Sequence, residues 1–340
     1  MIKYLGSKRV LVPMLVDMVT RLPGVRSVLD VFSGTARVGH ALKAAGLFVR
    51  ANDHNSYAHT LAHCYVQADG DTLAEPARRL LAELQATPPT AGWFTATYCE
   101  RARYLHPKNG AKVDAIRERI EALALAPDLR AVALVSLMEA ADRVDSTTGV
   151  QMAYLKSWAP RAHNDLELRM PKLLVGPGEA HDLDALAFVR KCGADAAYLD
   201  PPYNQHSYLG NYHVWETLVR WDRPEVYGIA CKRVDCRERR SPFNRRREIH
   251  GALRALVEAI DARWLVVSFS NEGYIAKDDM VELLSAHGDV TVQDVAYNRY
   301  VGAKIGIYNP RGEKVGRIGH LDNVEHVFTV DRLAKGRRAS

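Results

Sequence analysis

Two kinds of hydrophobic pattern alternate along residues 25–67 of this 340-residue chain. Short apolar runs, SVLD (27–30) and LFVRAN (47–52), predict buried strands. Each is followed by apolar residues at helical spacing, in TARVGHALKAAG (35–46) and SYAHTLAHCYVQ (56–67). Gly46 suits the position just after a helix. Strands and helices in this alternating order predict an α/β protein with a doubly wound sheet.

The alternation stops between residues 71 and 170, where three amphipathic segments predict helices: TLAEPARRLLAELQ, AIRERIEALAL and RAVALVSLMEAADRV. It resumes with KLLVGPGEAHDLDALAFVRKCG, ADAAYLDPPY, RWLVVSFS and KDDMVELLSAHG. The last part is β-rich, with VTVQDVAYNRYVG, KIGIYN and EHVFTV. We therefore expect an α/β domain formed by 1–70 and 171–330, with a helical insertion at 71–170 and a basic tail at 331–340.

The positive charge of the chain is concentrated in one segment. The net charge is +6, and residues 232–247 hold eight Lys and Arg against two Asp and Glu, an excess of the same size. Such a segment indicates a polyanionic partner, although a solvated surface loop has the same composition. Its candidate nucleic-acid contacts are Lys232, Arg233, Arg237, Arg239, Arg240, Arg245, Arg246 and Arg247. We expect the segment to lie outside the pocket beside the glycine-containing loop at 30–39.

Several classes of protein are disfavoured by composition. No window holds 18 uninterrupted apolar residues, and the N-terminus lacks the apolar run of a signal peptide. The five cysteines are scattered without CxxC spacing, which favours reduced thiols over zinc or disulfides. His59 and His63 are four residues apart, but no third ligand is evident. We expect a cytoplasmic protein with no metal and no membrane contact.

Carboxylates stand at the ends of three predicted strands. Asp30, Asp53 and Asp200 occupy these positions, and ligands of open parallel sheets bind at the carboxyl ends of the strands. After Asp30, Gly34 allows the backbone to pass close to a ligand. An aspartate at a strand end can also be a simple helix cap, so the three together carry the prediction of a ligand site.

The tetrapeptide DPPY (200–203) suits chemistry on the exocyclic amino group of a base. The carboxylate of Asp200 and the carbonyl of Pro201 can accept its two N–H bonds and so make the nitrogen lone pair available. The two prolines fix the backbone that presents these acceptors. Tyr203 can stack on the base, a contact worth about 1–3 kcal/mol. The alternative is a Pro-Pro loop with a partly buried tyrosine.

Three motifs together resemble the Dam-like, or alpha, group of adenine-N6 DNA methyltransferases: KYLGSK (3–8), DVFSGTARVG (30–39) and DPPY, in this order. The resemblance implies a Rossmann-like methyltransferase sheet, S-adenosylmethionine as cofactor and double-stranded DNA as partner, with a cognate restriction system as a further candidate partner. It implies that residues 1–70 and 171–330 form the catalytic domain and that the insertion at 71–170 is a candidate target-recognition region. The oligomeric state stays open. The alternatives are an RNA base methyltransferase and a catalytically dead nucleic-acid-binding fold.

The resemblance also implies roles for individual residues. Tyr4 and Lys8 match positions that contact the methionine part of the cofactor, with Lys8 on its carboxylate. The loop under the methionine corresponds to Asp30, Phe32 and Gly34, and Asp53 matches the acid on the ribose. Asp200, which also borders the cofactor, Pro201, Pro202 and Tyr203 match the catalytic motif. Asp182 is expected beside the cofactor's adenine.

Two positions leave specific questions. Position 36 is Ala where the family pattern usually has Gly. Alanine fits there if its φ is negative, and on that basis we expect a slightly altered turn and an intact pocket. The aromatic segment NQHSYLGNYHVWETL (204–218) can close over the base or pack the following helix, and we expect a mixed role.

Overall fold

The computed structural model of the chain describes residues 1–6, 8–151, 157–298 and 322–333. A seven-stranded sheet in the order β3-β2-β1-β4-β7-β9-β8 forms its centre. The strands are β1 (Ser27–Asp30), β2 (Phe48–Asn52), β3 (Glu179–His181), β4 (Ala196–Leu199), β7 (Trp264–Ser270), β8 (Asp289–Asn298) and β9 (Asp322–Asp331). The sheet is parallel where five of these strands pair with one another, namely β3, β2, β1, β4 and β7. β9 is antiparallel to both β7 and β8.

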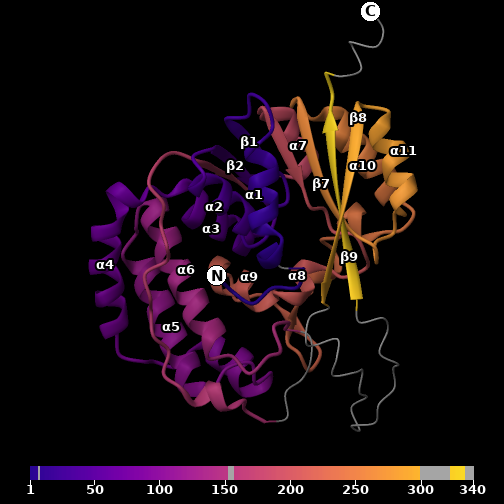
Figure 1. Cartoon of the computed structure of the whole chain (residues 1–340). Helices are drawn as coiled ribbons and strands as arrows, with labels where there is room; N and C mark the ends of the chain where they lie inside the picture. The colour runs from indigo at the N-terminus through magenta and orange to yellow at the C-terminus, as the bar shows by residue number, and fades with distance from the viewer. Residues whose placement is uncertain (7, 152–156, 299–321, 334–340) are drawn as a thin grey trace, which may run out of the picture.

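Helices cover both faces of the sheet (Figure 1). One face carries α7 (Ala185–Lys191), α10 (Ile249–Ala259) and α11 (Lys277–Ser285), whose apolar side chains share a cluster with those of β4, β7 and β9. The other face carries α1 (Val12–Thr20), α2 (Arg37–Ala44) and α3 (Ser56–Ala62), which share the second cluster. The predicted doubly wound α/β sheet is thereby confirmed, and its central strands are buried on both faces as this architecture requires.

The strand order explains why three distant aspartates meet. β1 lies between β2 and β4, and all three run in the same direction. Their carboxyl ends therefore lie at one edge of the sheet, where Asp30 ends β1, Asp53 follows β2 and Asp200 follows β4. This edge carries the candidate site.

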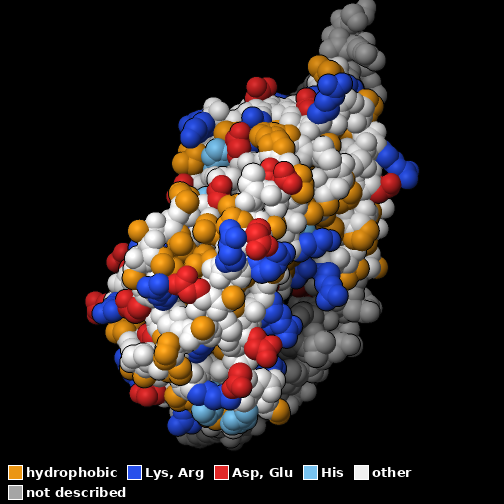
Figure 2. Space-filling view, turned by 90° about the vertical axis from the view of Figure 1, so that its left-hand side faces the viewer, with side chains coloured by type: hydrophobic (Ala, Val, Ile, Leu, Met, Phe, Trp, Pro, Cys, Tyr) orange, Lys and Arg blue, Asp and Glu red, His pale blue; other side chains and the backbone are white. Residues whose placement is uncertain are grey.

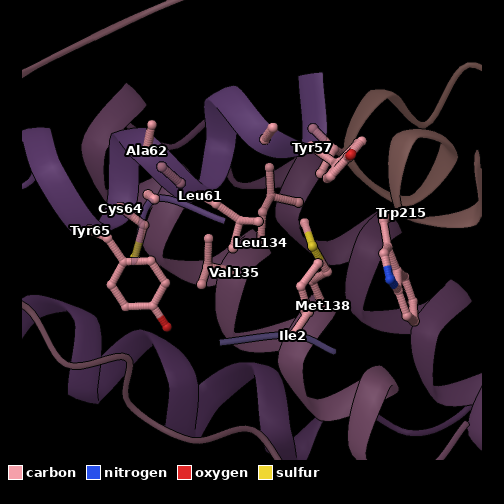
Figure 3. Packing of buried hydrophobic residues seen from close by; sticks show 14 of the residues in the cluster. Ile2, Tyr57, Leu61, Ala62, Cys64, Tyr65, Leu134, Val135, Met138 and Trp215 are labelled. Atoms are coloured by element: carbon pink, nitrogen blue, oxygen red, sulfur yellow. The ribbon is translucent and has the colours of Figure 1, made fainter. Parts of the chain in front are cut away.

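The insertion at 71–170 is helical, as predicted. It contains most of α4 (Gly70–Ala86), followed by η3 (Thr95–Arg101), α5 (Pro107–Ala122), α6 (Pro127–Arg143) and η4 (Pro160–His163). Its core is continuous with that of the α/β part of the chain. In Figure 3, Leu134 and Met138 of α6 pack beside Leu61 of α3, Trp215 of α9 (His213–Arg220) and Ile2 near the N-terminus. The insertion is therefore not a separately packed body.

The C-terminal part is β-rich, as predicted, because β8 and β9 pair over their whole length. The predicted strand KIGIYN lies at 304–309, outside the described residues, and so does most of the basic tail, 334–340. Two short strands, β5 (Val226–Tyr227) and β6 (Lys232–Arg233), form a separate hairpin.

Within the described ranges, no helix is long and apolar enough to cross a membrane. The same ranges contain no cluster of three His, Cys, Asp or Glu side chains that could hold a metal ion.

Candidate active site

A cavity of about 210 Å³ opens at the carboxyl edge of the sheet. It gathers residues from the N-terminal motif, the glycine loop, the end of β2, the DPPY motif and the basic segment. Of the residues predicted from sequence, its lining includes Tyr4, Lys8, Asp30, Phe32, Gly34, Asp53, Asp200, Pro202, Arg239 and Arg240. Segments far apart in the chain thus form one site.

The N-terminal motif is held in the site by stacked aromatic rings. Tyr4 stacks between Tyr208, at a centroid distance of 5.1 Å, and Tyr212, at 4.6 Å. A Cβ at Gly34 would lie 3.3 Å from the hydroxyl of Tyr4, so the loop passes close under this ring. Tyr208 also lines the cavity, whereas Tyr212 is buried. The packing role expected of the aromatic segment is therefore present, and its contact with a base stays a prediction.

The glycine loop turns tightly around a buried carboxylate. Oδ2 of Asp30 accepts the N–H of Gly39 at 3.1 Å. Burial raises the pKa of Asp30 to about 7, against the opposing effect of that hydrogen bond. Ala36 has φ = 58°, so the expected negative φ is wrong. The family pattern usually has glycine at this position. Here the alanine adopts a left-handed backbone conformation, although its Cβ makes that conformation unfavourable.

Asp53 braces the same loop. Its Oδ2 accepts the N–H of Gly34 at 3.1 Å, and its Oδ1 accepts the backbone N–H of Asn55 at 2.9 Å. Oδ1 also accepts the side-chain amide of Asn55 at 3.1 Å, so Oδ2 is the oxygen that keeps a further acceptor site. Asp53 can therefore hold the loop and accept a ligand hydroxyl at once, but its contact with a ribose stays a prediction.

Asp200 is held by a lysine that it shares with a second carboxylate. Nζ of Lys8 lies 3.0 Å from Oδ1 of Asp200 and 2.5 Å from Oε1 of Glu325 on β9. Burial raises the pKa of Asp200 to about 6, opposed by Lys8 and reinforced by Glu325. Burial alone would lower the pKa of Lys8, but Asp200 and Glu325 raise it well above its usual value. Lys8 is thus engaged with carboxylates of the chain, and its predicted contact with the cofactor's carboxylate stays untested.

The rest of the DPPY motif divides between cavity and core. Pro202 lines the cavity, and Pro201 is buried behind it. The half-buried ring of Tyr203 meets Phe269 edge-on at 6.0 Å, and its carbonyl accepts the N–H of Tyr274 at 2.9 Å. Tyr203 is anchored next to the cavity, and its stacking on a base stays a prediction.

One predicted cofactor contact lies away from the cavity. Asp182 is exposed and does not line it, whereas Asp184 does. Asp184 caps α7 by accepting N–H bonds from Leu186 and Ala187. The two-residue displacement arises because β3 ends at His181, and the chain reaches the cavity only at the helix start.

The basic segment is more structured than its composition indicates. Arg233 has a side chain that is only 2% exposed, and it forms ion pairs with Asp222 at 2.7 Å and Asp235 at 2.9 Å. The prediction that Arg233 contacts nucleic acid is therefore wrong, because its guanidinium is already paired inside the protein. Lys232 is partly buried, whereas Arg245, Arg246 and Arg247 are exposed. The guanidinium of Arg237 lies over the ring of Tyr227.

The expectation that this segment lies outside the cofactor pocket is also wrong. Residues 239–244 line the cavity, and Phe243 meets Phe32 of the glycine loop edge-on at 5.1 Å. Arg239 is fixed there by Glu216 at 3.0 Å and by the carbonyl of His54 at 2.8 Å. Figure 2 shows Lys and Arg side chains gathered near the middle of one face of the molecule.

The cavity suits a polar, cationic ligand such as S-adenosylmethionine. Buried polar atoms of its lining have no hydrogen-bond partner in the described part of the chain: Asp30 Oδ1, Ser33 Oγ, Arg37 Nε, Asn55 Oδ1 and Tyr198 Oη. Buried polar groups are normally paired, so these atoms are suited to ligand contacts. The carboxylates of Asp30, Asp53 and Asp200 border the same space. This set of donors and acceptors fits the cofactor's amino, hydroxyl and sulfonium groups.

Sequence reasoning missed Glu325 and Tyr198. Glu325 is an acid at an inward position of a strand whose other inward residues include Val327, and that pattern was a usable signal. Tyr198 lies two positions before Asp200, the first residue of the DPPY motif, and offered no such signal.

Comparison with known proteins agrees with this geometry. Residues 4–282 match the family profile of the D12 class N6 adenine-specific DNA methyltransferases. The chain is 30% identical over 320 residues to the modification methylase StsI of Streptococcus sanguinis, covering 88% of this chain but only 48% of that protein. It is 28% identical to the type II methyltransferase M.NlaIII of Neisseria lactamica, covering 94% of this chain and 98% of the relative.

A third relative is the type II methyltransferase M.CviAII of Paramecium bursaria Chlorella virus 1, at 27% identity over 86% of this chain and 90% of the relative. The profile match covers all three motifs that carried the resemblance, from Tyr4 to Tyr203. The chain belongs to the D12 class of N6 adenine-specific DNA methyltransferases.

Proposed function

We propose that this chain transfers a methyl group from S-adenosylmethionine to N6 of an adenine within a specific site of double-stranded DNA, as the modification enzyme of a restriction-modification system. The observation that carries the proposal is the position of Asp200. It lies at the carboxyl end of β4, beside the cavity, with Oδ1 held 3.0 Å from Lys8. Several relatives are named as type II methyltransferases, which supports the restriction-modification context.

The cofactor would supply a methyl group made electrophilic by the sulfonium. Asp200 and the carbonyl of Pro201 would accept the two N6–H bonds and direct the nitrogen lone pair at that methyl group. Transfer to N6 would break the bond between the methyl carbon and sulfur, and the proton that N6 loses would pass to solvent. Tyr203 would stack on the base after it leaves the duplex, which offsets part of the few kcal/mol that flipping costs.

The glycine loop would bind the cofactor. Asp30 and Asp53 would hold it through the loop that they brace, with Tyr4 packed against Gly34. The exposed Arg245, Arg246 and Arg247 would contact phosphates, and residues 71–170 would contribute to target recognition.

A direct test is methyl transfer by the purified chain from labelled S-adenosylmethionine to duplex DNA, single-stranded DNA and RNA, followed by nucleoside analysis of the product. We expect N6-methyladenine in duplex DNA. Transfer to RNA in preference to DNA would establish the RNA alternative. Binding of DNA without transfer to any substrate would establish the dead fold.

A further inference from the structure

Glu325 reaches the catalytic aspartate although it lies outside residues 4–282, the part of the chain that matches the family profile. Its Oε1 lies 2.5 Å from Nζ of Lys8, which lies 3.0 Å from Oδ1 of Asp200. The hydroxyl of Ser268 on the neighbouring strand β7 also donates to Oε1. The side chains of Lys8 and Glu325 are 8% and 2% exposed. One buried lysine therefore joins Asp200, which follows β4, to a carboxylate on β9, 317 positions along the chain from the lysine.

Fold stability alone does not explain an acid at this position. Glu325 faces the same side of β9 as Val327, where an apolar side chain would be buried without loss of hydration. Burying a charge costs several kcal/mol that a good ion pair only partly recovers, and replacing such pairs by apolar residues is often neutral or stabilising. The buried charge of Glu325 lies next to Asp200, and this position indicates that Glu325 has a role in the site.

Other titratable groups face this cluster from each element packed around it. They are Asp30 at the end of β1, Tyr198 on β4 and Tyr208 on α8 (Tyr208–Asn211). Lys8 is the cation that contacts both Asp200 and Glu325 in the described structure. Without Glu325, its charge would act on Asp200 alone and would depress the pKa of that carboxyl.

We propose that Glu325 is a positioning residue for methyl transfer, which holds Lys8 on Oδ1 of Asp200 and leaves Oδ2 for the amino group of the target base. Its negative charge also balances that of Lys8, so that Asp200 remains a strong hydrogen-bond acceptor. This inference rests on the proposed function, because it assigns Glu325 a role in that reaction. It adds a residue from the C-terminal hairpin to the site.

The test compares Glu325→Gln with Glu325→Asp in the full chain. Glu325→Gln should lower kcat about 10- to 100-fold and leave the KM values for S-adenosylmethionine and DNA within about threefold. The acid limb of its kcat/KM profile should move to lower pH, because a charge that raises the pKa of Asp200 has been removed. Glu325→Asp should recover part of kcat. Glu282→Gln, the same change on the exposed face of α11, is the matched control and should behave as wild type.

A second readout does not depend on activity. A ¹³C NMR titration of the Asp200 carboxyl, assigned by its absence in Asp200→Asn, should give a lower pKa in Glu325→Gln than in wild type. If Glu325→Gln does not fold, Ser268→Ala serves instead, with a smaller loss of kcat at unchanged KM. An unchanged Asp200 pKa would overturn the inference even if the wild-type chain were inactive on DNA. A folded, active wild type with Glu325→Gln kcat within twofold would overturn it while leaving the proposed function standing.

Discussion

Oδ2 of Asp53 accepts the backbone N–H of Gly34 at 3.1 Å, so the residue after β2 fixes the loop after β1. Asp53→Ala should therefore weaken S-adenosylmethionine binding about 10- to 100-fold, through a lost ligand contact and a loosened loop. Turnover should largely recover at saturating cofactor. Calorimetry measures the affinity, and Asp279→Asn on the exposed start of α11 is a control with no contact to the cavity. An unchanged affinity would remove Asp53 from the cofactor site.

Ala36 should be replaceable by glycine with a gain in stability. An L-residue in the left-handed region costs about 1–2 kcal/mol, whereas glycine adopts it freely. Glycine also gives the unfolded chain more conformational entropy, which lowers the free energy of unfolding by about 0.4–1 kcal/mol and offsets part of that gain. Ala36→Gly should thus raise the free energy of unfolding by about 0.5–1 kcal/mol in a denaturant titration. A destabilised variant would show that the methyl group of Ala36 packs well enough to outweigh its φ of 58°.

The three exposed arginines should act on DNA without regard to its sequence. Replacing Arg245, Arg246 and Arg247 by Ala should weaken binding to specific and non-specific duplexes alike. It should reduce the slope of log affinity against log salt by up to about 0.9 for each arginine lost. Fluorescence anisotropy at several salt concentrations measures both effects. An unchanged slope would show that these three arginines do not contact phosphates and that this part of the segment is a solvated surface loop.

Arg233 lies in the same segment but should behave differently. Its side chain is buried and paired with Asp222 and Asp235, so Arg233→Ala leaves both carboxylates with Arg220 alone as an ion-pair partner. We expect a loss of a few kcal/mol in the free energy of unfolding, because these carboxylates are only partly buried. The salt slope of DNA binding in the folded fraction should stay at the wild-type value. A lower slope with full stability would mean that Arg233 reaches phosphate after all.

The pH dependence of methyl transfer should follow Asp200. A protonated carboxyl accepts the amino N–H bonds poorly, and burial raises the pKa of Asp200 to about 6. Activity should therefore be lost as pH falls through about 6, where an ordinary aspartate would still be ionised. The kcat/KM profile of the free enzyme measures this directly. An acid limb near pH 4 would show that Asp200 is not raised by its surroundings.

The strands of the sheet and the aspartates at their ends could be predicted because hydrophobic periodicity and turn residues are visible within short stretches of sequence. Short apolar runs can only be buried strands in this context, and parallel order then brings Asp30, Asp53 and Asp200 to one edge. The features that sequence reasoning missed depend on long-range contacts. Lys8 and Glu325 are 317 positions apart, and nothing local to either predicts their pairing.

The errors have the same origin. Charge density made Arg233 look like a phosphate contact, because composition does not reveal which arginine meets Asp222 and Asp235. The sign of φ at Ala36 is imposed on the loop by its neighbours, and the side chain itself would favour a negative value. Asp182 and Asp184 differ in role only because β3 ends at His181.

The central claim is that Asp200 accepts the amino group of an adenine in DNA. The most direct measurement is base-modification sequencing of DNA from a methylation-free host that expresses either the wild-type chain or Asp200→Asn. We predict N6-methyladenine within one recurrent sequence in the first case and none in the second, with S-adenosylmethionine affinity of the purified variant within about tenfold of wild type. Wild-type levels of N6-methyladenine with Asp200→Asn, or methylation on a different atom by the wild-type chain, would contradict the account.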